Sequence, residues 1–207
     1  MNRITRVFVV SALAAATLSA CSDNGGHDMN TMSSTSPGTA TKSPSGTPAS
    51  GAHNAADVKF ATGMIPHHAQ AITMAAMVPT SATSQKVKDL AAQIQAAQDP
   101  EITQMSGWLQ GWGEPVPTAS GMQHGDGMMS GDGMMSMDEM NQLKDASGAT
   151  FDRMWLQMMI KHHQGAVAMA KTELTDGSNP EAKTLAQAIV ESQSHEIATM
   201  TALITDN

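Results

Sequence analysis

Residues 63–75 read Gly-Met-Ile-Pro-His-His-Ala-Gln-Ala-Ile-Thr-Met-Ala, and residues 158–170 read Met-Met-Ile-Lys-His-His-Gln-Gly-Ala-Val-Ala-Met-Ala. Each stretch places two adjacent histidines between methionines, in a pattern that is otherwise mostly apolar. Adding 95 to a residue number aligns the first stretch with the second without a gap. This doubled motif decides both the expected fold and the candidate chemistry.

The repeat extends well beyond the histidines. Across residues 57–109 and 152–204, 17 aligned pairs are identical, which indicates an internal duplication. Each copy contains two segments with apolar residues at helical spacing. Pro66 and Pro100 lie inside the segments of the first copy and predict local kinks there, which the second copy lacks.

The break between the two helices of each copy is expected at residues 79–81 in the first copy and at residues 176–179 in the second. In the second copy, Asn179 followed by Pro180 is typical of a helix start. Two helical hairpins in one chain predict an all-α fold, and the economical arrangement is a four-helix bundle.

The first residues of the chain predict export. Arg3 and Arg6 precede a short apolar run at residues 7–16, which is too short to span a membrane and is typical of a secretory signal. The run ends in Leu-Ser-Ala-Cys, which resembles a bacterial lipobox, so residues 1–21 are interpreted as a signal peptide with lipid attached to Cys21. The alternative is an ordinary signal peptide with a chance cysteine. Either interpretation places the protein outside the cytoplasm, on the periplasmic or extracellular face.

The rest of the chain divides by composition. Residues 22–53 are Ser, Thr, Gly and Pro with few apolar side chains, and they predict a disordered tether because they bury too little surface to offset chain entropy. Residues 54–206 are expected to form the duplicated bundle, with a Met- and Gly-rich linker at residues 111–147.

Composition argues against some classes of function. The chain has a net charge of −8 and no basic run, which makes it a poor candidate for nucleic-acid binding. Its single cysteine excludes an internal disulfide. There are 19 methionines and no tyrosine, and seven of the methionines lie within residues 121–140.

A helical wheel places the polar residues of the repeat toward the bundle interior. His68 shares a stripe with Met64, His67 lies along the edge of that stripe, and Gln98 and Glu101 share a face of the second helix. Burying imidazole and carboxylate is costly unless they are paired or bind a metal. Two interpretations remain: a metal site, or a core in which His and Glu hydrogen-bond and Met simply packs.

Neutral imidazole suits zinc, copper and iron, whereas thioether selects Cu(I). The chain contains no Glu-x-x-His and no His-Glu-x-x-His, which argues against di-iron and hydrolytic zinc sites. Methionines in a glycine-rich linker have no core to fill, so they favour Cu(I) or Ag(I) binding over low-complexity drift. The candidates in the linker are His124, Met128, Met129, Met134 and Met135.

The candidate metal ligands of the bundle are the doubled histidines and the methionines beside them, namely His67, His68, His162, His163, Met64, Met74, Met159, Met169, Met105 and Met200. Glu101 and Glu196 are expected either to orient the imidazoles or to bind a harder ion.

At these residues the chain resembles the bacterial family called domain of unknown function 305. The resemblance rests on Met-Ile-Pro-His-His…Ala-Ile-x-Met-Ala at residues 64–75, its copy at residues 159–170, and Gln-x-x-Glu-Ile-x-x-Met at residues 98–105. It covers roughly residues 54–206. The resemblance implies a ferritin-like four-helix bundle in exported proteins, some of them linked to copper binding and tolerance, and it supplies no defined reaction. Lys161 stands where the first copy has proline, so the second copy has diverged.

These patterns together predict an exported lipoprotein that binds Cu(I) for buffering, sequestration or tolerance, without turnover. Its partners would be the metal ion and, through the lipid alone, the membrane, with a homo-oligomer left open. Two alternatives remain: a ferritin-like metal-dependent oxidase that uses the same core, and a metal-free extracytoplasmic interaction module.

Overall fold

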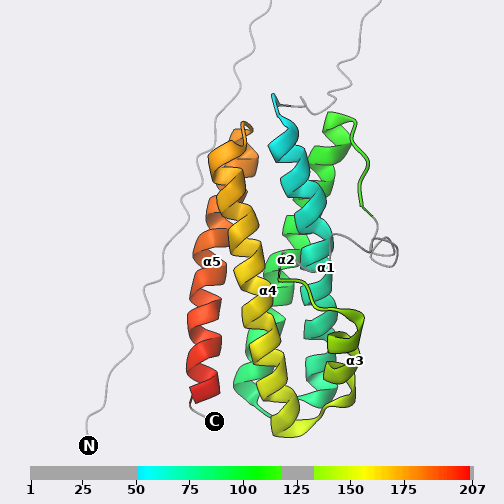
Figure 1. The fold of residues 1–207 in the computed structure, drawn as a ribbon, viewed down its shortest axis with the longest axis vertical. Helices are drawn as coiled ribbons and strands as arrows, with labels where there is room; N and C mark the ends of the chain where they lie inside the picture. The colour runs from blue at the N-terminus through cyan, green and yellow to red at the C-terminus, as the bar shows by residue number, and fades with distance from the viewer. Residues whose placement is uncertain (1–50, 118–132, 206–207) are drawn as a thin grey trace, which may run out of the picture. The chain divides into compact units, whose positions relative to one another are not determined.

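The computed structural model describes residues 51–117 and 133–205, and every regular element of this part is an α-helix. Its elements are α1 (Ala55–Ser81), α2 (Gln85–Trp112), α3 (Met137–Asp145), α4 (Gly148–Asp176) and α5 (Pro180–Thr205). The long helices α1, α2, α4 and α5 lie side by side, with the short α3 against one side of them (Figure 1). The all-α, four-helix bundle predicted from the repeat is confirmed.

The two copies of the repeat form two helical hairpins. Helix α1 packs mainly on α2, and α4 packs mainly on α5, while α1 and α4 join the hairpins to each other. Helix α3 contacts α1 and α4. The paired helices α1 and α4 therefore carry the doubled histidine motifs into the middle of the molecule.

A reciprocal pair of aspartates ties the hairpins together. Asp152 of α4 accepts hydrogen bonds from the backbone N–H groups of Thr83 and Ser84, at 3.2 and 2.9 Å, where α2 begins. Ser84 itself makes no side-chain cap, so a carboxylate from the other copy satisfies this helix start.

The other end of the bundle repeats the arrangement. Asp57 of α1 accepts from the backbone N–H groups of Ser178 and Asn179, at 3.1 and 2.8 Å, where α5 begins. Each residue of this set lies 95 positions from its counterpart in the other set. The duplicated sequence has thus folded with an approximate two-fold relation between its copies.

The position of the first helix break differs from the prediction. Helix α1 continues through Pro79 to Ser81, and the break falls at residues 82–84. Proline lacks only its own N–H, while the buried Val78 and the bond from Ala82 N to Val78 O hold the last turn in place. The site of capping by Asp152, rather than the proline, sets the break. In the second copy the predicted start at Asn179 is confirmed, since its side chain accepts from Glu181 N and Ala182 N.

Helix α3 was not predicted, because residues 111–147 were interpreted as a linker throughout. Its start is a capping box in which Ser136 Oγ accepts from Glu139 N and Glu139 accepts from Ser136 N. Leu143, at the far end of the helix, is fully buried. The Ser-x-x-Glu spacing was present in the sequence and would have revealed this helix.

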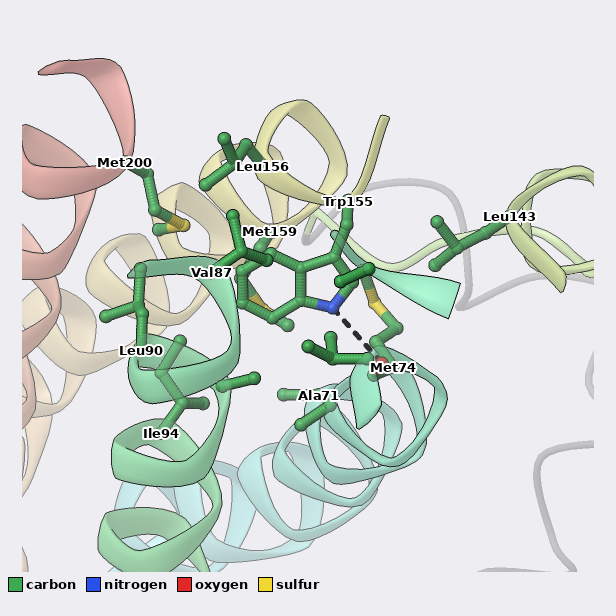
Figure 2. Packing of buried hydrophobic residues seen from close by; sticks show 14 of the residues in the cluster. Ala71, Met74, Val87, Leu90, Ile94, Leu143, Trp155, Leu156, Met159 and Met200 are labelled. Carbon is green, nitrogen blue, oxygen red and sulfur yellow. Dashed lines mark hydrogen bonds between the residues drawn. The ribbon is translucent and has the colours of Figure 1, made fainter. Parts of the chain in front are cut away.

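Two apolar clusters fill the bundle. One, which we call the Trp155 cluster, gathers buried residues from all four long helices and Leu143 from α3. Figure 2 shows the indole of Trp155 among Met74, Val87 and Met159 of this cluster, with its N–H donating to Met74 O at 3.1 Å. The other, the Phe60 cluster, lies at the opposite end of the same helices.

None of the helices in the described ranges combines the length and apolar character that a membrane span requires.

Candidate metal centre

A polar layer separates the two apolar clusters. Along each long helix, residues of one cluster are followed first by polar residues and then by residues of the other cluster. We call this set the histidine layer, and it consists of His67, His68, Gln98, Glu101, His162, His163, Gln193 and Glu196. The layer interrupts an otherwise continuous core, so its polar atoms must find partners or cost stability.

All four histidines of the layer are buried, with exposures of 0 or 1%. Two of them pair with carboxylates from the second helix of their own copy. His68 Nε2 lies 2.6 Å from Glu101 Oε2, and His163 Nε2 lies 2.7 Å from Glu196 Oε2. The expected pairing of imidazole with carboxylate is therefore present in both copies.

The other two histidines meet between the copies. The rings of His67 and His162 lie 3.7 Å apart, centroid to centroid, at an angle of 39°. The 100° between neighbouring side chains on a helix thus sends one histidine of each pair to its own hairpin and the other across to the second hairpin. This arrangement explains why two adjacent histidines can both be buried.

Burial and neighbouring imidazoles keep His162 neutral. Burial, followed by the neighbouring His67, His163 and His68, lowers the pKa of His162 well below its ordinary value. Low dielectric disfavours the charged ring, and the surrounding imidazoles would repel a second positive charge. His162 is therefore a neutral imidazole at ordinary pH, the form that binds metals.

Several buried atoms of the layer have no hydrogen-bond partner among the described residues. They include His68 Nδ1, His163 Nδ1 and the Oε1 atoms of Gln98 and Gln193. Because a carboxylate can only accept, Nε2 of each paired histidine donates to it, and in the neutral ring Nδ1 then carries the lone pair. The symmetric layer thus holds imidazole lone pairs inside the bundle, each oriented by a glutamate.

The predicted methionines of the bundle flank the layer. Met74, Met159 and Met200 belong to the Trp155 cluster, whereas Met64 and Met105 belong to the Phe60 cluster, and all five are fully buried. Met169 packs against the Phe60 cluster and is partly buried. Their thioethers therefore lie in the apolar core on both sides of the histidines, where they contribute packing whether or not they bind metal.

Met134 and Met135 were expected in a linker with no core to fill, and that premise is wrong. Both are buried, at 8% and 3% exposure, and Met135 joins the Trp155 cluster. The carboxamide of Gln70 holds the backbone of Met135 in place, donating to its carbonyl at 2.8 Å and accepting from its N–H at 2.7 Å. No pattern in the sequence indicated that Gln70 would anchor the linker.

The remaining predicted residues, Cys21, His124, Met128 and Met129, lie outside the described residues, as does the predicted signal peptide. They stay predictions.

The donor set of the layer suits a soft or borderline cation better than a hard one. Imidazole nitrogens are present in excess, thioethers lie on both sides, and the two glutamates already accept from histidine. Within the described ranges, no group of three or more His, Cys, Asp or Glu side chains is arranged to hold a metal ion. A metal site here would therefore require thioether or amide ligands, or a shift of the imidazoles.

Residues 57–204 match the family model described as domain of unknown function (DUF305). The chain belongs to this family. A search of curated proteins found no match.

Solved structures resemble the chain over most of the bundle. A DUF305 protein of Streptomyces coelicolor that is proposed to be secreted shares 34% identity, with a TM-score of 0.65, and the match covers 73% of this chain and 93% of that one. CopM in its Cu(II)-bound form shares 38% identity, with a TM-score of 0.63, over 72% and 96% of the two chains. CopM in its Cu(I)-bound form has a TM-score of 0.60 at 35% identity, over the same shares of the two chains.

Proposed function

We propose that this protein binds Cu(I) in the histidine layer and acts as a copper-buffering or sequestering protein of the cell envelope. The observation that carries the proposal is the pair of buried, unpartnered Nδ1 atoms on His68 and His163, each on a ring held by a glutamate. Metal-binding histidines commonly donate their other N–H to a carboxylate, which fixes the tautomer and raises the basicity of the ligand nitrogen.

The surroundings of these nitrogens favour Cu(I). Thioethers of Met64 and Met159 lie one helical turn before His67 and His162, in equivalent positions of the two copies. Thioether and neutral imidazole together select Cu(I) over harder ions. That CopM, a structural neighbour at 33 to 38% identity, is known in Cu(I)-, Cu(II)- and Ag-bound forms supports the same ligand class here.

We place the protein outside the cytoplasm, anchored by lipid on Cys21. The signal-like run at residues 7–16 and the Leu-Ser-Ala-Cys ending support this placement, together with the proposed secretion of the Streptomyces coelicolor neighbour. A buffering role needs binding and release without turnover.

The decisive experiment is a Cu(I) titration of the full chain against a competing colorimetric chelator. In the test variant His67, His68, His162 and His163 are all replaced by Gln, which keeps an amide donor for each glutamate. A second variant lacks residues 121–132, so that the described part of the linker stays intact. The proposal expects the first variant to lose the tightest Cu(I) sites and the second to retain them.

Circular dichroism must show that both variants keep the helical content of the wild type. If the four-histidine variant is folded and binds as much Cu(I) as wild type, the histidine layer is a structural polar core and the proposal is wrong. Copper-dependent oxidation of a substrate by the wild type would instead favour the oxidase alternative.

A further inference from the structure

The described part of the linker closes one side of the histidine layer. Residues 133–145, which we call the clasp, consist of an extended start at residues 133–136 followed by α3. Its start contacts α1 through Gln70 and α4 through Lys161 and Gly165.

These contacts lie one helical turn from His67 and His162. Gln70 follows His67 by three residues, and Gly165 follows His162 by three, so each lies one turn along the same helix face. Positions 70 and 165 are equivalent in the repeat. The carboxamide of Gln70 hydrogen-bonds the clasp, whereas Gly165 has no side chain. The clasp therefore crosses between α1 and α4 one turn from the His67–His162 pair and breaks the two-fold relation of the copies there.

The crossing is close and depends on glycine. Gly133 has φ of +79°, a conformation that other residues rarely adopt. A Cβ at Gly133 would overlap the carbonyl oxygen of Lys161 and lie 3.1 Å from Gly165 Cα. The backbone of the clasp thus rests on the backbone of α4.

The two halves of the clasp are held by separate sets of contacts. Helix α3 is anchored by the fully buried Leu143 and by an ion pair of 2.9 Å between Lys161 and Glu139. The start of the clasp is held by the two hydrogen bonds of Gln70 and by the burial of Met134 and Met135. Because these sets share no residue, the start can detach while α3 stays docked, at the cost of the two hydrogen bonds and of exposing two methionines.

We propose that residues 133–135 are a gate through which Cu(I) reaches His67 and His162, with Gln70 as its latch. The inference rests on the proposed function. The histidines are buried, so an ion needs an opening, and moving a long helix would disrupt both apolar clusters. Opening the gate breaks two hydrogen bonds and brings two thioethers, from Met134 and Met135, to meet the incoming soft ion.

The test compares the rate of Cu(I) uptake with the amount bound at equilibrium, using the full chain and stopped-flow mixing with Cu(I) in a weak chelator. Gln70→Leu keeps a similar side-chain volume, removes both hydrogen bonds and adds no metal ligand, and Gln85→Leu makes the same exchange at an exposed site whose side chain bonds Asp89. The gate predicts uptake roughly tenfold faster in Gln70→Leu, as two lost hydrogen bonds imply, with unchanged capacity and no change in the control.

Hydrogen exchange of the Met135 amide, measured without metal, gives an independent readout. In the Gln70 variant this exchange should be faster than in wild type by a similar factor. Gly133→Ala, which strains the clasp without altering α1, should also speed uptake.

If Met135 exchange accelerates while uptake is unchanged, the ion enters elsewhere, for example past the partly exposed Glu101 and Glu196, and the gate is wrong. If Met135 exchange does not change, Gln70 is not the latch. Failure of the proposed function is a different result, since the four-histidine variant would then bind Cu(I) as wild type does.

Discussion

The two ends of the bundle use the same cap but differ in one buried side chain. At one end Asp152 caps the start of α2, and at the other Asp57 caps the start of α5. Next to Asp57 lies Glu173, which is 1% exposed, whereas the equivalent position in the first copy is the fully buried Val78. Duplication supplied the cap twice, and divergence added a second carboxyl at one end only.

The added carboxyl changes the electrostatics of its end. Burial, followed by the nearby Asp57, raises the pKa of Glu173 from 4.5 to about 8. For Asp57, burial alone would raise the pKa, but hydrogen bonds, led by that from Asn179, outweigh it and lower the pKa. Asp57 therefore stays ionised while Glu173 keeps its proton near neutral pH. The comparison teaches that divergence after duplication can give one end of a fold a buried, protonated carboxyl where the other end has an apolar side chain.

The largest effect is expected from installing the carboxyl where it is missing. Val78→Glu places an ionisable group in the Trp155 cluster, on a side chain with no solvent exposure. We expect a loss of about 4 kcal/mol or more in the free energy of unfolding at pH 8, and less at pH 4, where the carboxyl is protonated. Urea denaturation at both pH values measures it. Val78→Thr, of similar volume and uncharged, is the control, and an equal cost for the two variants at pH 8 would contradict the prediction.

The second-largest destabilisation is expected from removing the capping aspartate. Asp152→Ala leaves the N–H groups of Thr83 and Ser84 without their acceptor, and we expect about 3 kcal/mol of destabilisation. Asp57→Ala removes an equivalent cap but also relieves the repulsion that Glu173 would feel on ionising. Its cost at pH 8 should therefore be smaller by about 1 kcal/mol. Equal costs for the two substitutions at pH 8 would show that the acid pair does not affect stability.

The fold followed from sequence because its determinants are local and repeated. Helical spacing, the gapless offset and the Asn179-Pro180 start were all readable, and they led to the correct bundle. The clasp was not predicted, because its contacts join residues far apart in sequence: Gln70 binds Met135, and Gly133 rests on α4. Glycine- and methionine-rich composition gave no indication that this part of the linker is buried.

The histidine layer was predictable in composition but not in geometry. Sequence identified the histidines and glutamates, and proposed that glutamate orients imidazole. It could not assign which histidine pairs with glutamate and which meets the other copy, since this depends on how α1 and α4 are rotated against each other. The ring contact between His67 and His162 is a tertiary contact with no local signal in the sequence.

Removing the extra carboxyl, that of Glu173, is expected to stabilise the protein, and by less than the losses predicted above. Below pH 4.5 Glu173 is protonated in both the folded and unfolded states, so it contributes no pH dependence. Between pH 4.5 and about 8 the unfolded chain loses this proton while the folded chain keeps it, so stability falls as pH rises and levels off above 8. Glu173→Gln should remove this loss, which corresponds to about 4 kcal/mol at pH 8. The buried amide of Gln offsets about half of that gain, so we expect a net stabilisation of roughly 2 kcal/mol. The measurement is the difference between variant and wild-type unfolding free energies from pH 4 to 9. A difference that stays constant with pH would show that Glu173 has an ordinary pKa.

The smallest expected effect tests the other diverged pair of equivalent positions, Phe60 in the first copy and Trp155 in the second. Both are buried, but only the indole donates a hydrogen bond, to Met74 O at 3.1 Å. Trp155→Phe makes the second copy like the first, and it removes this bond together with part of a fully buried ring. We expect a loss of about 1 to 2 kcal/mol, because the methionines around the indole can adjust to fill part of the space. Thermal unfolding measures the loss, with Trp108→Phe as the control, since that indole is only partly buried and bonds Glu181 near the surface. If Trp155→Phe lowers the free energy of unfolding no more than Trp108→Phe does, the Trp155 indole adds no particular stability to its cluster. The two copies would then have equivalent cores despite their different aromatic residues.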